Sequence, residues 1–410
     1  MDHLDLSAIM ERGYALPPSH DGESAPLLHQ VASPWKIEKH LCKDIAFQVL
    51  VANNTPDFRT ISDFRKDHLK ALAGLFLQVL KLCQKAGLVK LGHVALDGTK
   101  IRANASKHKA MSYKRMKEEE VRLEAEVAVL LKKAEVVDEE EDRWYGRGKR
   151  GNELPKELAF RESRLQKIQE ARKALGEDAK HEAEIAAASN KKHTGKKHTG
   201  VPDDKAQRSF TDPESHIMPA PGGKHFLQAY NAQAAVDSAH QVIVAAEVTN
   251  KPTDRGQAEP MMEVVKVNTG QLPCQMSADA GYFSTDAVKN LTTIGIDVYM
   301  PPDKISHRRA TLPPAPRGRI PKNLSIVDRM RRKLRTKKGR EHYGLRKELP
   351  EPVFGQIKQA RGFSQFLLRG SDKVSGEGKV ICAGHNLLKL FGAHRKGLLS
   401  REILAVVPAQ

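Results

Sequence analysis

Cysteine, aromatic residues and long apolar runs are all scarce in this 410-residue chain. Its four cysteines are far apart and form no C-x-x-C pair, which argues against both a disulfide framework and a zinc site and favours a reducing cytosol. No apolar run approaches the ~18 residues that span a bilayer, and the acidic, proline-bearing start does not resemble a secretory signal. We therefore expect a globular cytoplasmic protein of two or three domains with no membrane partner.

Acidic residues are too few to balance the basic ones. The chain has 68 Lys+Arg against 50 Asp+Glu, a formal net charge of +18 and a pI near 9.6. This excess predicts a polyanionic partner, and nucleic acid fits better than a membrane because no basic amphipathic helix with an aromatic face is present. Sixteen basic residues face four acidic ones between residues 302 and 350, so we expect residues 302–345 to form a basic, phosphate-binding loop. The alternative is a solvated loop that only keeps the protein soluble.

Proline content and periodicity divide the chain into segments. Prolines interrupt residues 1–35, where we expect irregular structure, as in a degraded N-terminus. Residues 36–90 carry two amphipathic patterns and predict a small helical domain that binds DNA, although core packing alone also explains their apolar faces. Residues 91–395 predict a larger domain, interrupted at 112–190 by charged helix-forming segments that predict an inserted helical hairpin. Residues 396–410 are expected to form a tail.

An α/β fold is predicted for residues 91–395. Alternating patterns predict strands in HVALD, at 226–238 and at 240–250, with the last two joined by a tight turn. Further short strands are predicted to end at Asp279 and to cover 296–302. Helices are predicted at 255–272, 284–295, 351–370 and 379–393. Without the insertion the order is strand, strand, strand, helix, strand, helix, strand, helix, which is the order of a ribonuclease-H-like mixed sheet flanked by helices.

Two aspartates are expected to come together at the centre of this sheet. The strand order places Asp97 at the end of the first strand and Asp279 at the end of the fourth, and these strands are neighbours in such a sheet. A helix packed on the sheet would bring Glu351 to the same edge. Three crowded carboxylates repel one another unless divalent cations neutralise them, and two Mg²⁺ ions, or Mn²⁺, would suit in-line phosphoryl displacement. Taken singly, each acid is also explained as a turn residue or a first-turn helix acid.

Three sequence blocks, LDGTKIRANASKHK, SADAGYFS and EPVFGQIKQARGFSQFLLRG, resemble the signature blocks of bacterial insertion-sequence transposases of the DDE type. FTDPES and YNAQAAVDSAHQVIVAAEVT are similar to that family as well. The resemblance implies that Asp97, Asp279 and Glu351 are the catalytic and metal-binding triad. It also implies a nucleoid-associated protein of the bacterial cytoplasm that binds the terminal inverted repeats of its element. Such a protein catalyses Mg²⁺-dependent cleavage and strand transfer of double-stranded DNA, and we expect it to act as a homodimer on paired transposon ends and target DNA.

Basic and aromatic residues around the acids are the predicted DNA contacts. Related families carry a Tyr, Arg, Glu, Lys signature around the third acid, which this chain can fill. Arg346 lies one position further from the glutamate than is usual, with Lys347 in its place. The predicted DNA contacts are Lys100, Arg102, Tyr343, Arg346, Lys347, Lys358 and Arg361. The alternative for those near the third acid is a surface helix with scattered charges.

Several positions depart from the family pattern. Pro350 stands before the third acid, where an aliphatic residue is expected, and the segment before residue 36 is broken by prolines instead of forming an apolar helix. Ser371, Ser375 and Gly378 occupy positions where apolar or aromatic side chains are expected. Two alternatives therefore stay open: a catalytically inactive DNA-binding remnant of a transposase, and a related endonuclease that performs no strand transfer.

Overall fold

The computed structural model describes residues 34–106, 109–145, 156–188, 200–220, 225–303, 318, 321 and 323–398. The expected irregular structure before residue 34 and the end of the expected tail lie outside these residues. The chain divides into two compact units. The first, here called the sheet unit, comprises residues 1–103 and 229–410, and the second, the hairpin unit, comprises residues 104–228. The predicted domain boundaries stay a prediction.

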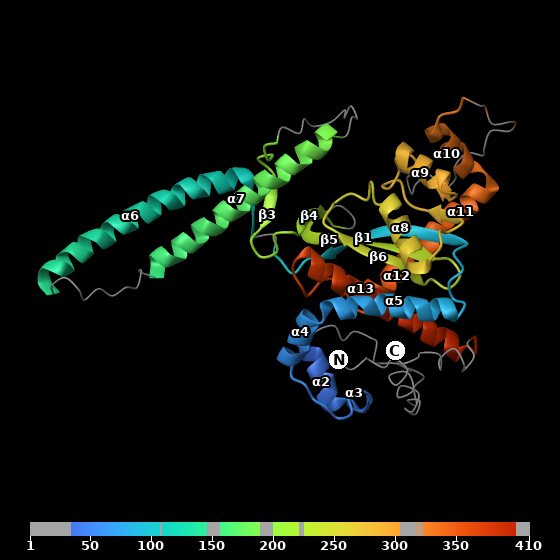
Figure 1. Ribbon diagram of the computed structural model, residues 1–410, viewed down its shortest axis with the longest axis horizontal. Coiled ribbons are helices and arrows are strands. Elements are labelled where there is room, and N and C mark those ends of the chain that lie inside the picture. Colours follow the sequence, from blue (N-terminus) through green and yellow to red (C-terminus); the bar gives the residue numbers. More distant parts are fainter. Residues whose placement is uncertain are drawn as a thin grey trace. The chain divides into compact units, whose positions relative to one another are not determined.

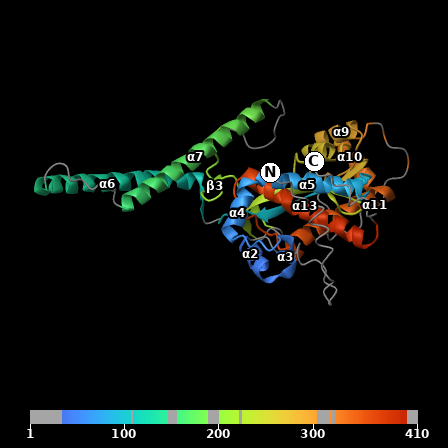
Figure 2. The same ribbon diagram turned by 60° about the horizontal axis from the view of Figure 1, so that its bottom comes forward.

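The sheet unit begins with a group of helices. These are α2 (Pro34–Lys43), α3 (Ile45–Leu50), α4 (Phe58–Asp67) and α5 (Leu69–Lys85). Asp57 caps α4, because its side chain accepts a hydrogen bond from the Thr60 backbone N–H at 2.7 Å. The apolar face of α5 is buried, with Phe76 and Leu80 at its centre. α5 packs lengthwise against α13 (Ser371–Arg395), as Figures 1 and 2 show.

A mixed sheet forms the centre of the fold. Its strands are β1 (His93–Arg102), β4 (His216–Pro219), β5 (Phe226–Asp237), β6 (Ile243–Thr249), β7 (Gln275–Ser277) and β8 (Asp297–Tyr299). Their order is β4-β5-β1-β7-β8, with β6 paired to β5. β1 runs antiparallel to β5 and parallel to β7, and β7 runs parallel to β8. α8 (Ala258–Thr269) and α13 pack against β6. The prediction of a mixed α/β sheet flanked by helices is confirmed.

β1 is longer than the sequence predicts. It pairs with β5 from Val94 opposite Asp237 to Arg102 opposite Ala229, so its ladder continues well past Asp97. The prediction that Asp97 ends the first strand is therefore wrong, because the antiparallel partner keeps the backbone hydrogen-bonded through the charged residues that follow. The prediction that the strands carrying Asp97 and leading to Asp279 are neighbours is confirmed by the β1–β7 pairing.

The basic segment is largely helical where the structure describes it. α9 (Thr285–Thr293) precedes β8, and α10 (Ile326–Arg335) and α11 (Lys337–Glu348) follow it, grouped together in Figure 2. A loop across all of 302–345 was a wrong prediction. Ser325 caps α10 by accepting from the Asp328 N–H at 3.0 Å, and Thr336 caps α11 by accepting from the Gly339 N–H at 2.9 Å. Met330 and Leu334 give α10 a buried face.

The third signature block is only partly helical. α12 (Pro350–Gly355) continues into a short π-helix, Gln356–Ala360, and the chain then leaves the helix instead of continuing to residue 370 as predicted. The backbone returns to the end of β1, where Arg102 donates to the Ser364 carbonyl at 3.3 Å and Phe366 donates to the Arg102 carbonyl at 2.9 Å. This pairing competes with helix formation over 361–370.

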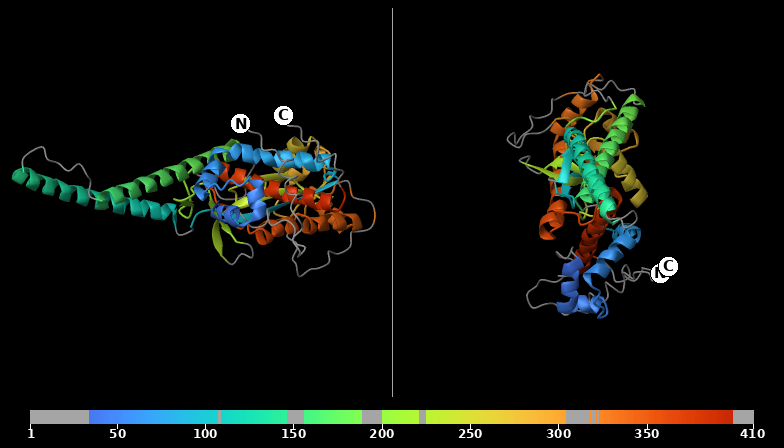
Figure 3. Two further views of the ribbon diagram at one scale, coloured as in Figure 1. Left: turned by 90° about the horizontal axis from the view of Figure 1, so that it is seen from below. Right: turned by 90° about the vertical axis from the view of Figure 1, so that its left-hand side faces the viewer.

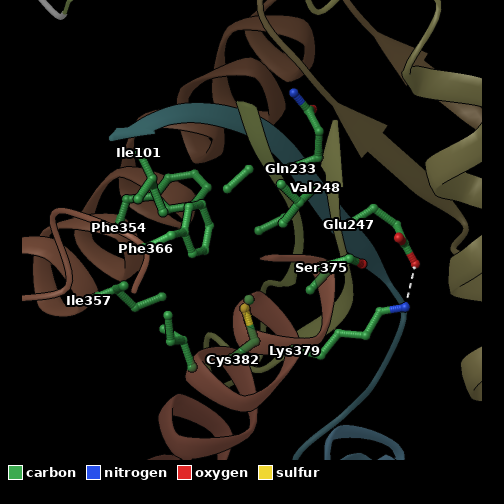
Figure 4. A pocket seen from close by; sticks show the side chains of 15 residues that line it. Ile101, Gln233, Glu247, Val248, Phe354, Ile357, Phe366, Ser375, Lys379 and Cys382 are labelled. Carbon is green, nitrogen blue, oxygen red and sulfur yellow. Dashed lines mark ion pairs between the residues drawn. The ribbon is translucent and has the colours of Figure 1, made fainter. Parts of the chain in front are cut away.

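An apolar cavity of about 30 Å³ lies between α13 and the sheet, beside their packed contact (Figure 4). Val248, Phe354 and Phe366 line it, together with the α13 residues Ser375 and Gly378. These are two of the positions where the sequence analysis expects apolar or aromatic side chains. A β-carbon at Gly378 would lie 2.9 Å from Val248 Cγ2, so the gap cannot be filled from Gly378 without moving β6.

The hairpin unit contains two long helices, α6 (Tyr113–Tyr145) and α7 (Lys156–Ala188), and the short strands β2 (Ala110–Ser112) and β3 (Gln207–Ser209). Figure 3 shows α6 and α7 side by side over part of their lengths. Met116, Leu123 and Ile168 form a small buried core between them. Ion pairs flank this core: Arg164 with Glu119, Arg161 with Glu126, and Arg172 with Glu120. The alternating charges therefore join the two helices as well as facing solvent.

Within the described part of the chain, no helix combines the length and the apolar character that crossing a bilayer requires.

Candidate active site

The pairing of β1 with β7 brings two distant aspartates level with each other. The last paired residues are Ala95 on β1 and Ser277 on β7. Asp97 and Asp279 each lie two residues further along, and side chains two residues apart point to the same face of a strand. A hydrogen bond from the Gly281 N–H to Asp279 Oδ1, at 2.7 Å, turns the chain after β7. The strand order thus places both carboxylates at one point beside the centre of the sheet.

Asp97 lies in a protein environment that disfavours its charge. The pKa of this carboxyl is raised to about 7, mainly by burial, and the nearby carboxylates of Asp279 and Asp254 act in the same direction. The guanidinium of Arg346 and the backbone N–H of Gly98, which donates to Asp97 Oδ1 at 2.9 Å, act in the opposite direction. Any further cation that approaches Asp97 would therefore stabilise the ionised form of its carboxyl.

Arg346 connects the second and third acids. Its Nη1 lies 3.7 Å from Asp279 Oδ2, and its Nη2 lies 3.2 Å from Glu351 Oε1. The Arg346 side chain is 13 % exposed and its Nε has no hydrogen-bond partner, whereas the Glu351 side chain is 51 % exposed. The guanidinium therefore stands between Asp279 and Glu351 and neutralises part of their charge.

Pro350 and Pro352 flank Glu351 without disturbing the helix. α12 begins at Pro350, so all three residues lie in its first turn. Backbone N–H groups in the first turn of a helix have no intrahelical acceptor, and a proline there loses no hydrogen bond. The unusual Pro350 before the third acid is thus compatible with the position of Glu351 beside the sheet.

Asp97, Asp279 and Glu351 have the oxygen ligands that a divalent cation binds, but their carboxylates are not grouped around one position. Three carboxylates are the oxygen ligands that Mg²⁺ prefers. Among the residues that the structure describes, however, no three Asp, Glu, His or Cys side chains are grouped closely enough to hold a metal ion. Glu351 can join Asp97 and Asp279 at one ion only when Arg346 leaves its place between them.

Two lysines lie beside β1. Lys358 Nζ donates to Thr99 Oγ1 at 2.6 Å and to the Lys100 carbonyl at 2.7 Å, which fastens the π-helix to the strand. Lys100 Nζ lies 3.6 Å from Asp254 Oδ1, and its side chain is 15 % exposed. Burial lowers the pKa of both lysines, although neighbouring carboxylates partly restore that of Lys100.

The other predicted DNA contacts differ in their surroundings. Arg102 and Lys347 are exposed. Tyr343 is half-buried beside Arg346, and burial raises the pKa of its hydroxyl. Arg361 is 4 % exposed and its Nη2 donates to the Ile381 carbonyl at 3.4 Å, inside the protein. The prediction that Arg361 contacts DNA disagrees with this burial, and we leave it out of the contacts proposed below.

Sequence reasoning missed Asp254, which follows β6 in the segment KPTDRG. Asp254 Oδ1 accepts hydrogen bonds from Asn231 Nδ2 at 2.7 Å and from Gln233 Nε2 at 2.8 Å. Both amides lie on β5, two residues apart and on one face. Tyr282 in turn donates a hydrogen bond to Gln233 Oε1. An acid between the end of a strand and the start of a helix was the available signal, but a turn residue looks the same in sequence.

Part of the basic segment is neutralised within the protein. Arg331 pairs with Asp303 through Nε at 2.7 Å and with Asp328 through Nη1 at 2.9 Å. Lys333 pairs with Asp297 and donates to the Val298 carbonyl at 2.7 Å. The exposed cations of the segment include Lys337, Lys338 and Arg340, at the start of α11.

One comparison with known proteins gives a match. Residues 319–391 match the family model described as "Transposase DDE domain". No curated protein and no solved structure matches the chain. The matched segment contains Arg346, Glu351 and Lys358, whereas Asp97 and Asp279 lie before it.

Proposed function

We propose that this chain is an insertion-sequence DDE transposase that binds the terminal inverted repeats of its element, a proposal supported by the match of residues 319–391 to a transposase DDE domain. We propose further that it cleaves the element's ends and joins them to target DNA. Asp97, Asp279 and Glu351 are the catalytic residues of this proposal, on a ribonuclease-H-like sheet. The observation that carries it is the level placement of Asp97 and Asp279, 182 positions apart in sequence, with Arg346 linking Asp279 to the Glu351 of the matched domain.

The residues of the site have distinct roles in the proposed reaction. Asp97, Asp279 and Glu351 would hold two Mg²⁺ or Mn²⁺ ions. Such ions would supply Lewis-acid activation of the attacking water or 3′ hydroxyl and charge stabilisation at the leaving oxygen. Arg346 exchanges its carboxylate partners for a DNA phosphate when the acids take up cations, because a guanidinium binds phosphate in the same bidentate way as carboxylate.

The remaining cations position the DNA. Arg102 and Lys347 are exposed and can reach the phosphate backbone, and Tyr343 lies beside Arg346. Lys100 and Lys358 are partly buried beside Thr99 and Asp254, and we propose that they act close to the scissile phosphate. Paired element ends require two copies of the site, and we propose a homodimer on double-stranded DNA.

A nicking assay tests the proposal. The substrate is a supercoiled plasmid that carries the inverted repeats found beside the gene, incubated with Mg²⁺. We expect Asp97→Asn, Asp279→Asn and Glu351→Gln each to reduce nicking about a hundredfold or more. Glu247→Gln is the matched control. It makes the same chemical change at a carboxylate that pairs with Lys379 at 3.0 Å, beside the cavity in Figure 4.

The outcomes also separate the alternatives. Mg²⁺-dependent nicking followed by joining to a second plasmid supports the transposase. Nicking without joining identifies an endonuclease. DNA binding with no nicking by the wild-type protein contradicts the proposed activity and identifies the inactive remnant, an alternative favoured by the absence of any three metal-binding side chains grouped together in the described residues.

A further inference from the structure

Asp254 lies against both segments that carry the catalytic aspartates. A β-carbon at Gly98, the residue after Asp97, would lie 2.6 Å from Asp254 Oδ1. A β-carbon at Gly281 would lie 2.9 Å from Asp279 Oδ1 and 3.5 Å from Asp254 Oδ2. The two glycines therefore leave room for the Asp254 carboxylate, which reaches the space between Asp97 and Asp279.

The orientation of Asp254 is fixed through one of its oxygens. Asn231, Gln233 and Lys100 all approach Oδ1, at 2.7, 2.8 and 3.6 Å. Within the described part of the chain no partner is found for Oδ2, which faces Gly281. A carboxylate held by one oxygen presents the other in a defined direction, which is how hydrogen-bonded partners orient a metal ligand.

A buried oxygen lacks a donor at the same place. Asn231 is 0 % exposed, and its Oδ1 has no hydrogen-bond partner among the residues that the structure describes. This oxygen would lie 3.1 Å from a β-carbon at Gly98, so it faces the same space as Asp254. A buried carbonyl oxygen without a donor is unfavourable unless a cation or a water molecule satisfies it.

The charges around this space do not balance. Asp97, Asp254, Asp279 and Glu351 carry four negative charges when ionised, and Lys100 and Arg346 supply two positive ones. Lys358, whose Nζ donates to Thr99 Oγ1 at 2.6 Å, adds a third positive charge nearby, so the ionised acids still exceed the cations. Lys100 Nζ pairs with Asp254 Oδ1 at the long distance of 3.6 Å.

We propose that Asp254 is a fourth acid of this active site, whose Oδ2 binds a divalent cation together with the carboxylates of Asp97 and Asp279. The inference rests on the proposed function for the chemistry of the site, but it adds a ligand to the three acids of the transposase signature. Because no three Asp, Glu, His or Cys side chains are grouped closely enough for an ion among the described residues, Asp97 and Asp279 would have to turn toward Oδ2 to hold it. Asn231 Oδ1 would be available as an acceptor at the same place. Asp254 would then hold a cation with the two aspartates while Arg346 still contacts Glu351.

Binding of Mn²⁺ to the DNA-free protein tests the proposal. Free Mn²⁺ is counted by its electron paramagnetic resonance signal during titration of the wild type, Asp254→Asn and Glu247→Gln. Asparagine keeps an oxygen that accepts from Asn231 and Gln233, while an amide nitrogen that cannot bind a cation replaces the other oxygen and the charge is lost. We expect Asp254→Asn to weaken Mn²⁺ binding about tenfold or more, with no change in Glu247→Gln. Equal Mn²⁺ affinity and stoichiometry in all three proteins would overturn the proposal.

A second measurement needs no variant. Fe²⁺ bound in place of Mn²⁺ produces hydroxyl radicals with ascorbate and peroxide, which cut the backbone beside the ion. We expect fragments ending near residues 97, 254 and 279 of the wild-type chain, and no cutting near 254 would contradict the proposed ligand. The fate of the proposed function is read separately from the nicking assay. If nicking depends on Glu351 but Asp254→Asn binds Mn²⁺ like the wild type, only this inference is contradicted. If Mn²⁺ binding depends on Asp254 but the protein does not nick DNA, only the proposed function is contradicted.

Discussion

At the scale of single residues, Arg346 supplies the acids with counter-charge of the kind that a divalent cation would also supply. Its guanidinium contacts Asp279 and Glu351 and lowers the pKa of Asp97, while burial raises that pKa. Ion pairs of half-buried groups of this kind prevent repulsion more than they add stability. Arg346 therefore reduces the repulsion among the three acids. Its position between Asp279 and Glu351 also prevents these acids from surrounding one ion.

Replacing this arginine should make the protein depend on metal for stability. Arg346→Gln leaves the acids without their counter-charge, so we expect a lower melting temperature than the wild type without metal. We also expect a larger rise in melting temperature on addition of Mn²⁺, because the ion now neutralises charges that Arg346 neutralised before. Thermal unfolding with and without Mn²⁺ measures both effects, and Arg346→Lys is the control that keeps the charge. Equal rises for wild type and Arg346→Gln would show that arginine and metal do not compete.

Asp97 gives a prediction about pH. Its carboxyl has a pKa of about 7 in the folded protein, because of burial, against about 4 in the unfolded chain. Between these values the folded state binds more protons, so the free energy of unfolding falls as the pH rises. An asparagine does not titrate. We expect Asp97→Asn to be more stable than the wild type above about pH 7, by a few kcal/mol at most, and the difference to shrink toward about pH 4. Urea unfolding of metal-free protein across this range measures it, and a difference that grows toward acid pH would contradict the raised pKa.

The site could be predicted from sequence only where it follows from strand order. Asp97 and Asp279 meet because β1 and β7 are neighbours, and the order of strands was readable from periodicity. Asp254 could not be found in this way, since its place depends on the path of the segment between β6 and α8 and on two amides of β5. Arg361 looked like a surface cation, but the chain turns after the π-helix and buries it.

At the scale of elements, the alternation and periodicity of apolar residues predicted strands and helices better than the pattern of charges did. The strands and helices of residues 226–302 follow from their alternation and caps. α10 and α11 were missed because sixteen like charges within 302–350 predict self-repulsion. Acids 28 and 36 residues before their partners relieve it: Asp303 pairs with Arg331, and Asp297 pairs with Lys333. Neither pairing can be predicted from the residues next to each cation.

The close approach of β1, β5 and the segment that carries Asp254 makes one glycine critical. Gly98 lies opposite Gln233 in the β1–β5 ladder, and a β-carbon there would overlap Gln233 Nε2 and lie 2.6 Å from Asp254 Oδ1. We expect Gly98→Ala to lower the free energy of unfolding by about 1–3 kcal/mol, although alanine is the better strand residue elsewhere. Gly92→Ala is the control, because a β-carbon at Gly92 would meet nothing within 4 Å. Urea unfolding measures the free energy of unfolding of both variants. Equal values would contradict the close packing of Gly98 against Gln233 and Asp254.

At the scale of the whole molecule, the net charge of +18 is informative only through its distribution. The hairpin unit pairs many of its charges between α6 and α7, as with Arg164 and Glu119. The α10–α11 segment instead exposes cations close in sequence to Arg346 and Glu351. A basic surface beside an active site steers the phosphate backbone toward it, whereas evenly spread charge mainly affects solubility.

The dependence of DNA affinity on salt separates these two roles. Each phosphate contact contributes about 0.9 to the slope of log K against log salt on duplex DNA. We expect the triple change Lys337→Gln, Lys338→Gln and Arg340→Gln to reduce the magnitude of that slope by up to about 2.7, because three counterion-releasing contacts are lost. The control removes the same total charge from the exposed α7 lysines through Lys167→Gln, Lys173→Gln and Lys180→Gln. Filter binding over a range of salt concentrations gives both slopes. If the two triple variants change the slope equally, the start of α11 makes no phosphate contacts of its own and the excess charge acts only in bulk.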